Sequence, residues 1–432
     1  MHNWIERDKK AIWHPFTPLK GMDDVLMIDK AEGVNLYTDE GKKIIDVISS
    51  WWVNIHGHAN SYLAQAIADQ AKALEHVIFA GFTHKPAIEL AERLLEILPE
   101  NQSKVFYSDN GSTATEVAIK MAFQYFFNQG IKKTKIIAID GAYHGDTFGA
   151  MSVGDRGPFT EPFDPYLFDV EFLDFPHADK EEAVWEHYVS LVESGDVAAF
   201  IFEPLVQGAS GMQFYSAELL DKMICFGQKN DVVCIADEVM TGFGRLGTLF
   251  AADQLDHKPD IMCLSKGLTG GALPMGVTTC TDKIQSVYRS NDLMKTFFHG
   301  HSFTGNPIIA AVANASLDLL LTEACQQNRE RLNKRHKAFF KKIEKHPLVR
   351  NPREIGTILA FDLNTDKDTS YFNEARHHLY PYFIEKGLLI RPLGNVIYLI
   401  PPYIISDEDL DYIYQTLLDF LDEYPSIIAK ES

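Results

Sequence analysis

Val232-Val-Cys-Ile-Ala-Asp-Glu-Val239 and, further along, Asp260-Ile-Met-Cys-Leu-Ser-Lys-Gly-Leu-Thr-Gly-Gly271 are the most informative segments of this chain. Each is an apolar run that ends in a polar residue, which is typical of a buried strand with chemistry at its carboxyl end. Asp237 ends the first run, and Lys266 follows the second. We therefore expect a carboxylate and a lysine at the tips of two successive strands.

Strands and helices alternate between residues 103 and 280. Helical patterns at 112–127 and 216–229 separate apolar runs of strand length. This alternation predicts an α/β fold in which a mainly parallel sheet is covered on both faces and has its site at the strand carboxyl ends. The expected strands are Lys104–Tyr107, Lys135–Ile139, Ala198–Phe202, Val232–Ala236, Ile261–Leu264 and Gly276–Thr279.

The two ends of the chain are expected to combine into a smaller α+β domain. Its parts would be residues 1–55 and 326–432, and residues 56–325 would form the large domain. Further strands are expected at Val25–Ile28, Val34–Tyr37, Lys43–Val47, 355–363, 387–391 and 396–400, and further helices at 60–98, 306–345, 370–386 and 407–423.

The length and composition of the chain argue against several classes of protein. A chain of 432 residues exceeds one typical core, and its net charge of −20 argues against a nucleic-acid partner. It has no apolar run of about 18 residues, so we expect no membrane span. The first ten residues lack the apolar region of a signal peptide, and the five cysteines lack metal-binding spacing. Together these features favour a cytoplasmic enzyme without a structural metal.

The pairing of Lys266 with Asp237 matches what a pyridoxal phosphate enzyme requires. The lysine amine bonds covalently to the cofactor aldehyde, and the carboxylate keeps a proton on the pyridine nitrogen. The small neighbours Ser265 and Gly267 would let a planar ligand approach. Val239 lies two residues beyond Asp237, on the same side of an extended segment, and would press on the ring, although a plain core valine is nearly as good an interpretation. Taken alone, Lys266 could be a solvated strand end and Asp237 a turn cap.

The segment Asp109-Asn-Gly-Ser-Thr-Ala-Thr-Glu116 follows a predicted strand and opens a helix. Gly111 and Ser112 would offer backbone amides and a hydroxyl to a phosphate at the helix amino terminus. The alternative is a capping box with Ser112 or Thr113 as the N-cap and Glu116 near the third position. Both interpretations can hold together.

Two further strand ends carry polar side chains. Tyr143 is placed to stack on an aromatic cofactor, and the following His144 and Asp146 are expected to form hydrogen bonds instead of binding a metal. Glu203 and Gln207 follow the strand at 198–202 and should point toward the same edge of the sheet.

Other residues are candidates for substrate binding. Arg245 lies in the glycine-rich segment Thr241-Gly-Phe-Gly-Arg245, which we interpret as a flexible loop, and Arg391 ends a predicted strand. Each guanidinium suits a carboxylate. The pair Trp51 and Trp52 could anchor a core or wall a pocket for a long apolar chain, and Tyr398 lies in the strand after Arg391.

Taken together, these segments resemble the class III aminotransferases, pyridoxal phosphate enzymes of fold type I, over nearly the whole chain. The motifs that carry the resemblance are Asp237-Glu-Val239 with Thr241-Gly-Phe-Gly-Arg245, Leu264-Ser-Lys-Gly-Leu-Thr-Gly-Gly271 and Gly300-His-Ser-Phe-Thr-Gly-Asn-Pro307. The resemblance implies a large domain with a seven-stranded type of sheet and a small domain built from both termini. It also implies a homodimer with shared active sites.

Three more motifs resemble those class III enzymes that act in biotin biosynthesis. They are Ile12-Trp-His-Pro-Phe-Thr-Pro18, Ser49-Ser-Trp-Trp52 with Ile55-His-Gly-His58, and Arg391-Pro-Leu-Gly-Asn-Val-Ile-Tyr-Leu-Ile-Pro-Pro-Tyr403. The function implied is conversion of 8-amino-7-oxononanoate to 7,8-diaminononanoate by a two-stage ping-pong reaction. S-adenosylmethionine is the implied amino donor, with lysine as the alternative.

The resemblance also assigns roles to single residues. Lys266, Asp237 and Tyr143 would be catalytic. The same three residues would bind the cofactor together with Gly111, Ser112 and Val239. His301 and Ser302 would bind the cofactor of the neighbouring subunit. Substrate contacts would come from Phe16, Trp51, Trp52, Tyr143, Arg245, Lys266, Gly300, Arg391 and Tyr398. The family often has Pro-Thr at His301-Ser302 and tyrosine at Phe16; the first change keeps a hydroxyl and the second loses one.

Two other functions remain open at this point. One is a class III aminotransferase for ornithine, acetylornithine or 4-aminobutyrate. The other is a regulator that binds pyridoxal phosphate without turnover, although such proteins usually carry a DNA-binding module, for which this acidic chain has no room.

Overall fold

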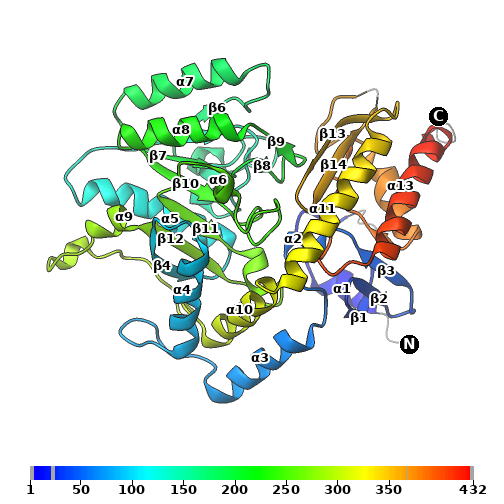
Figure 1. Ribbon diagram of the computed structural model, residues 1–432, viewed down its shortest axis with the longest axis horizontal. Helices are drawn as coiled ribbons and strands as arrows, with labels where there is room; N and C mark the ends of the chain where they lie inside the picture. Colours follow the sequence, from blue (N-terminus) through cyan, green and yellow to red (C-terminus); the bar gives the residue numbers. More distant parts are fainter. Residues whose placement is uncertain (1–3, 21–24, 366, 429–432) are drawn as a thin grey trace.

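The computed structural model describes residues 4–20, 25–365 and 367–428. Figure 1 shows a large body that holds the middle of the chain and a smaller body in which the blue amino-terminal strands lie beside the orange and red carboxy-terminal elements. The arrangement agrees with the expectation that both chain ends share one unit. The exact domain boundaries at 55/56 and 325/326 stay a prediction.

The large body is built on a seven-stranded sheet in the order β4-β12-β11-β10-β7-β5-β6. Strand β12 is antiparallel to both neighbours, and the pairings among β11, β10, β7, β5 and β6 are parallel. The sheet is therefore mainly parallel, as predicted. Its strands are β4 (Gln102–Ser108), β5 (Lys135–Ile139), β6 (Glu171–Leu173), β7 (Val197–Phe202), β10 (Val233–Asp237), β11 (Ile261–Leu264) and β12 (Gly276–Thr281).

Helices cover both faces of this sheet. Alternate strand residues point to opposite faces, so Ile235 packs with α5 (Gly111–Phe127) in one cluster, whereas Cys234 and Ala236 belong to another. That second cluster includes α4 (Lys85–Ile97), α7 (Glu181–Glu193) and α8 (Ala217–Lys229). Because both faces are buried, the strands read as continuous apolar runs instead of alternating ones.

The smaller body joins segments from both ends of the chain. β1 (Ile28–Glu32), β2 (Asn35–Thr38) and β3 (Lys43–Asp46) form a sheet with β15 (Leu388–Leu389), which runs parallel to β3. A second sheet contains β13 (Val349–Ile355), β14 (Ile358–Leu363) and β16 (Val396–Leu399). One buried cluster combines Val34 and Ile45 with residues of α11 (Glu323–Ile343), α12 (Arg376–Glu385) and α13 (Asp407–Ile428).

The structure confirms the six predicted strands of the large sheet and corrects several other elements. The prediction omits β6, which has three residues, and α7. The single helix expected at 306–345 is broken into α10 (Pro307–Leu320) and α11, which are bent by 67°. Thr322 caps α11 by accepting from the Cys325 backbone N–H, which explains the break. The strand expected at 25–28 begins only at Ile28, and the one expected at 355–363 begins only at Ile358, after a turn that joins it to β13.

The helical region expected at 60–98 also contains two separate helices, α3 (Ser61–Ala73) and α4. Within the ranges that the structure describes, no single helix has the length and apolar character needed to cross a membrane.

Candidate active site

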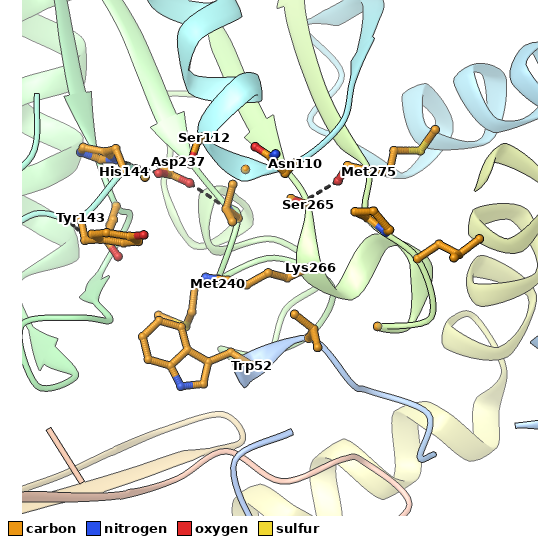
Figure 2. A pocket seen from close by; sticks show the side chains of 18 residues that line it. Trp52, Asn110, Ser112, Tyr143, His144, Asp237, Met240, Ser265, Lys266 and Met275 are labelled. Atoms are coloured by element: carbon orange, nitrogen blue, oxygen red, sulfur yellow. Dashed lines mark hydrogen bonds and ion pairs between the residues drawn. The ribbon is translucent and has the colours of Figure 1, made fainter. Parts of the chain in front are cut away.

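A cavity of about 360 Å³ lies at the carboxyl ends of β10 and β11. Figure 2 shows the Lys266 side chain extending into the space bordered by Asp237, Tyr143 and Trp52. Seven of the predicted site residues line this cavity: Trp52, Gly111, Ser112, Tyr143, Asp237, Val239 and Lys266. The parallel strands bring them together because their carboxyl ends meet at one edge of the sheet.

Asp237 is the last residue of β10 and is only 4% exposed. Its Oδ2 lies 2.7 Å from His144 Nδ1, and its Oδ1 accepts from the Val239 backbone N–H at 3.0 Å. The chain therefore turns after Asp237, and our reason for placing Val239 on the same side of an extended segment was wrong. Val239 nevertheless lines the cavity: a Cβ added at Gly111 would lie 2.8 Å from its Cγ1.

His144 is fully buried and completes the Asp237 site. Its Nδ1 faces the carboxylate, so the imidazole donates from this nitrogen, and its Nε2 is buried without a hydrogen-bond partner among the described residues. The predicted hydrogen-bonding role of His144 is confirmed. Within the described part of the chain, no group of three or more histidine, cysteine, aspartate or glutamate residues could hold a metal ion.

Lys266 begins a short 3-10 helix that is separated from β11 by Ser265 alone, and it has a left-handed φ of 44°. This conformation is unfavourable for a lysine and is often found at functional sites. Burial of the amine lowers the pKa of Lys266 to about 8, and the negative charges of Asp237 and Glu203 oppose this effect. With a pKa in this range, about half of the amine is neutral and nucleophilic near pH 8, far more than for an ordinary lysine.

The lowered pKa of Lys266 predicts how the cofactor-free protein takes up pyridoxal phosphate. Only the neutral amine attacks an aldehyde, so the uptake rate should rise with pH, reach half of its limit near pH 8 and level off above that. Stopped-flow absorbance measures this directly. A lysine derivative with a blocked α-amine serves as the control and should respond nearer the ordinary value of 10.5. Equal midpoints for protein and control would contradict the prediction.

The amino terminus of α5 forms another part of the cavity wall. Asn110 is its N-cap and forms a capping box with Thr113, so our capping alternative based on Ser112 or Thr113 as the N-cap was wrong. Glu116 lies outside this box and accepts from the backbone N–H groups of α6 (Phe148–Ser152). The cavity-lining Gly111 and Ser112 thus lie in the first turn of a helix, where backbone amides have no partner within the helix and suit a phosphate.

Tyr143 forms one side wall of the cavity and is anchored at both ends. Its hydroxyl donates to Asp146 Oδ2 at 3.0 Å, and its backbone N–H donates to Glu203 Oε1 at 3.0 Å. Glu203 also accepts from the Gly208 backbone N–H, and burial raises its pKa to about 7. Glu203 lines the cavity, whereas Gln207 donates to the Asp140 carbonyl behind it.

A second group of predicted residues lies next to the cavity. The ring of Trp51 is 5.8 Å from the ring of Phe16, and the guanidinium carbon of Arg391 lies 5.4 Å from the Trp51 ring centre. These three side chains are exposed, whereas Tyr398 is buried and accepts from Trp52 Nε1 at 3.2 Å. The structure therefore brings Phe16, Trp51 and Arg391 together and uses Tyr398 to support Trp52.

Arg245 is placed differently from our expectation. The loop that carries it is buried, and the side chain is 1% exposed. Its guanidinium donates to the backbone carbonyls of Pro401, Trp52 and Asn54 at 3.1, 3.2 and 3.4 Å. These bonds join the loop to segments near both chain ends, so Arg245 holds the site together and does not line the cavity. The interpretation as a flexible loop was wrong because its glycines serve close packing, not mobility.

Gly300, His301 and Ser302 do not line the cavity of a single chain. Gly300 and Ser302 are exposed, and His301 Nδ1 lies 3.4 Å from Asp109 Oδ2. Their contact with a phosphate would need a neighbouring subunit, so this assignment stays a prediction.

The sequence did not point to several residues that line the cavity. Asn110, Met240 and the segment 273–275 were not named as site residues. Asn110 could have been found as the N-cap that precedes the phosphate-binding helix. Met240 and residues 273–275 are apolar and carry no signal that separates them from the core.

The residues present fit pyridoxal phosphate. An amine that can be neutral and a buried carboxylate face one cavity, an aromatic ring walls it, and the first turn of a helix, whose backbone amides suit a phosphate, lines it as well. The cavity volume is also in the range of ordinary cofactor sites.

Comparison with known proteins agrees with this chemistry. Residues 20–421 match the family described as Aminotransferase class-III. This chain belongs to the class III aminotransferases, a family that implies pyridoxal phosphate as the cofactor.

Several similar proteins share the name of one particular enzyme within this family. The chain is 48% identical to the adenosylmethionine-8-amino-7-oxononanoate aminotransferase of Synechococcus elongatus, over 95% of this chain and 98% of that protein. The enzyme of the same name from Helicobacter pylori is 36% identical over 98% of each chain. The crystal structure of the Methanocaldococcus jannaschii enzyme of that name superimposes with a TM-score of 0.92 at 35% identity, covering 97% of this chain and 98% of that one.

Proposed function

We propose that this protein transfers an amino group to 8-amino-7-oxononanoate, with S-adenosylmethionine as the donor, and so forms 7,8-diaminononanoate for biotin biosynthesis. The observation that carries the proposal is the Lys266 amine facing Asp237 in one cavity, with Trp52 beside it. The names of the relatives, which match over nearly their whole length, support the choice of substrates.

The cofactor would be held by Lys266, Asp237, Tyr143, Val239 and the amino terminus of α5 at Gly111 and Ser112. When bound, pyridoxal phosphate supplies a carbonyl carbon that condenses with amines and a cationic ring that accepts electrons. Proton transfer and charge stabilisation are carried out by side chains of the protein.

Lys266 performs the proton transfers. When its amine is free and neutral, it would take the proton from the donor Cα as a general base, and the ammonium so formed would then serve as the general acid. A lowered pKa suits both steps, because the amine must be neutral to accept a proton and charged to donate one. In the second half-reaction the same amine works in reverse on the C7 carbon of 8-amino-7-oxononanoate.

Asp237 supplies a fixed negative charge in a buried site. The bond from His144 fixes the direction of one carboxylate oxygen, and the Val239 backbone N–H fixes the other. A preorganised charge of this kind stabilises a cationic partner without reorganising during the reaction.

The group next to the cavity suits the long acid chain of the substrate. Arg391 would pair with the distant carboxylate, and the rings of Trp51 and Phe16 would cover the alkyl chain. Phe16 has no hydroxyl, so no hydrogen bond to substrate is expected from its side chain. Arg245 is left out of this set because its guanidinium is engaged with backbone carbonyls.

We further propose a cytoplasmic homodimer. Gly300, His301 and Ser302 would then approach the active site of the neighbouring subunit, where the Ser302 hydroxyl would reach the phosphate. The exposure of Gly300 and Ser302 in one chain supports this assignment.

A half-reaction experiment tests the substrates. The protein loaded with pyridoxamine phosphate should return to the aldehyde form, seen by absorbance, when 8-amino-7-oxononanoate is added. A parallel screen of S-adenosylmethionine against lysine identifies the donor in the first half-reaction. Failure with 8-amino-7-oxononanoate, together with turnover of ornithine, acetylornithine or 4-aminobutyrate, would favour another class III aminotransferase.

Replacement of Arg391 by alanine tests the carboxylate contact. We expect the KM for 8-amino-7-oxononanoate to rise about 10- to 100-fold, the range for losing a hydrogen bond to a charged group, with a smaller change in kcat. Steady-state kinetics measures both. Arg289→Ala is the control, because Arg289 pairs with Asp282 on the surface. An unchanged KM in Arg391→Ala would remove Arg391 from the substrate site.

A further inference from the structure

The segment Ser49-Ser-Trp-Trp52, which we call the tryptophan turn, has an unusual backbone. Ser49, Ser50 and Trp52 have left-handed φ angles of 53°, 60° and 67°, and none of them is glycine. Trp51, which lies between them, has φ −175° and ψ 57°, so the segment is not a regular helical turn. Such a run of unfavourable conformations persists only when the surrounding structure holds it in place.

The turn presents its two tryptophans to different parts of the site. Trp52 lines the cavity, and the Lys266 amine lies 4.6 Å from its ring centre. Trp51 contacts Phe16 and Arg391 outside the cavity. The strained backbone thus places Trp52 in the cavity wall and directs the preceding residue, Trp51, toward Phe16 and Arg391.

A buried carboxylate holds the turn. The Asp46 side chain is fully buried; its Oδ1 accepts from the Ile48 backbone N–H at 3.2 Å, and its Oδ2 accepts from Ser50 Oγ at 2.9 Å. The same Oδ2 lies 2.8 Å from His58 Nε2. The carboxylate therefore joins residues before, within and after the turn.

The hydrogen bonds around His58 define which nitrogen donates. Asn54 Oδ1 accepts from the Gly57 backbone N–H at 2.7 Å, so the Asn54 amide nitrogen points to His58 Nδ1 at 3.2 Å. Nδ1 is then the acceptor, and Nε2 carries the proton that is donated to Asp46. His58 is in this way oriented from both sides.

We propose that Asp46 and His58 are positioning residues for substrate binding, which act by holding the tryptophan turn in its strained conformation. Neither residue lines the cavity, so their effect is transmitted through Trp51 and Trp52. This inference rests on the proposed function for its kinetic test and has a second test that does not depend on the substrate.

The kinetic test compares four variants. Asp46→Asn places an amide NH2, which is a donor, opposite the donors Ser50 Oγ and His58 Nε2, and His58→Leu leaves the buried carboxylate short of one donor. Each should raise the KM for 8-amino-7-oxononanoate about tenfold, since a buried bond to a charged group is lost, while kcat stays within about threefold. His58→Gln keeps an amide donor near the position of Nε2 and should remain close to the unmodified enzyme.

Asp260→Asn is the fourth variant and the matched control. Asp260 is also a buried carboxylate, but it accepts from the Cys234 backbone N–H and from Gln228 at the other end of the strands. Its replacement should lower thermal stability without changing KM.

The second test measures acrylamide quenching of tryptophan fluorescence in the enzyme loaded with pyridoxal phosphate. Trp52 is 4% exposed, so loosening of the turn should raise the quenchable fraction in Asp46→Asn and His58→Leu but not in His58→Gln or Asp260→Asn. The increase should be lost when Trp52→Phe is combined with Asp46→Asn.

The outcomes separate the two proposals. If the unmodified enzyme does not act on 8-amino-7-oxononanoate, the proposed function fails and the quenching test still decides whether Asp46 and His58 hold the turn. Unchanged quenching in Asp46→Asn would overturn the positioning role. An equal rise of KM in Asp260→Asn, or damage by His58→Gln equal to that by His58→Leu, would overturn it as well.

Discussion

Replacement of Lys266 by alanine is expected to stop both half-reactions. The side chain is the covalent attachment point and the proton carrier, so kcat should fall by at least about 10⁴-fold, the upper end of the contribution of general acid–base catalysis. The cofactor should still bind at Asp237 and the α5 amino terminus, but weakly and without a covalent bond. The variant should therefore lose its visible absorbance band on gel filtration.

Borohydride reduction gives an independent measure of the same role. It should fix the cofactor on the peptide that contains Lys266 in the unmodified enzyme and leave Lys266→Ala unlabelled. Lys283→Ala is the control, because Lys283 lies on the surface near Asp231. Lys266→Arg keeps the positive charge but lacks a nucleophilic amine, so it should fail in the same way. Substantial turnover in Lys266→Ala would contradict the whole proposed mechanism.

Asp237→Asn is expected to have the next largest effect. The amide oxygen can still accept from His144, so the fold and cofactor binding should survive, but the negative charge is lost. Loss of one preorganised electrostatic group costs about 10²- to 10³-fold in kcat, and we expect the loss here to fall on proton removal from the donor Cα. Single-turnover absorbance with a donor deuterated at Cα measures that step.

Two observations would check the interpretation of Asp237→Asn. The isotope effect should increase, because proton removal becomes more rate-limiting. Asp260→Asn, the buried carboxylate at the other end of the strands, should leave the single-turnover rate nearly unchanged. A loss of less than about tenfold in Asp237→Asn would mean that the charge is not used in the chemical step.

Local patterns in the amino-acid sequence were enough to predict the large sheet and the centre of the site. β5 and β11 have the predicted bounds because apolar runs of strand length bounded by polar residues are a local signal. The positions of Lys266 and Asp237 follow from the same signal, since each lies where a strand ends. The broken helix at residues 321–322 and the three-residue β6 were missed because their local signals are weak.

Which distant side chains meet depends instead on the packing of the whole chain. The His144–Asp237 contact spans 93 residues, and the bond from Arg245 to the Pro401 carbonyl spans 156. In the sequence, Arg245 resembles a solvated loop arginine, yet the packing of the chain buries it. The tryptophan turn resembles an ordinary polar-aromatic segment, yet its backbone has strained φ angles, and Asp46 bonds to Ser50 within it and to His58 after it. Strands and their ends are specified locally, but a buried donor or acceptor takes whichever partner the fold brings within reach, because leaving it unpaired is costly.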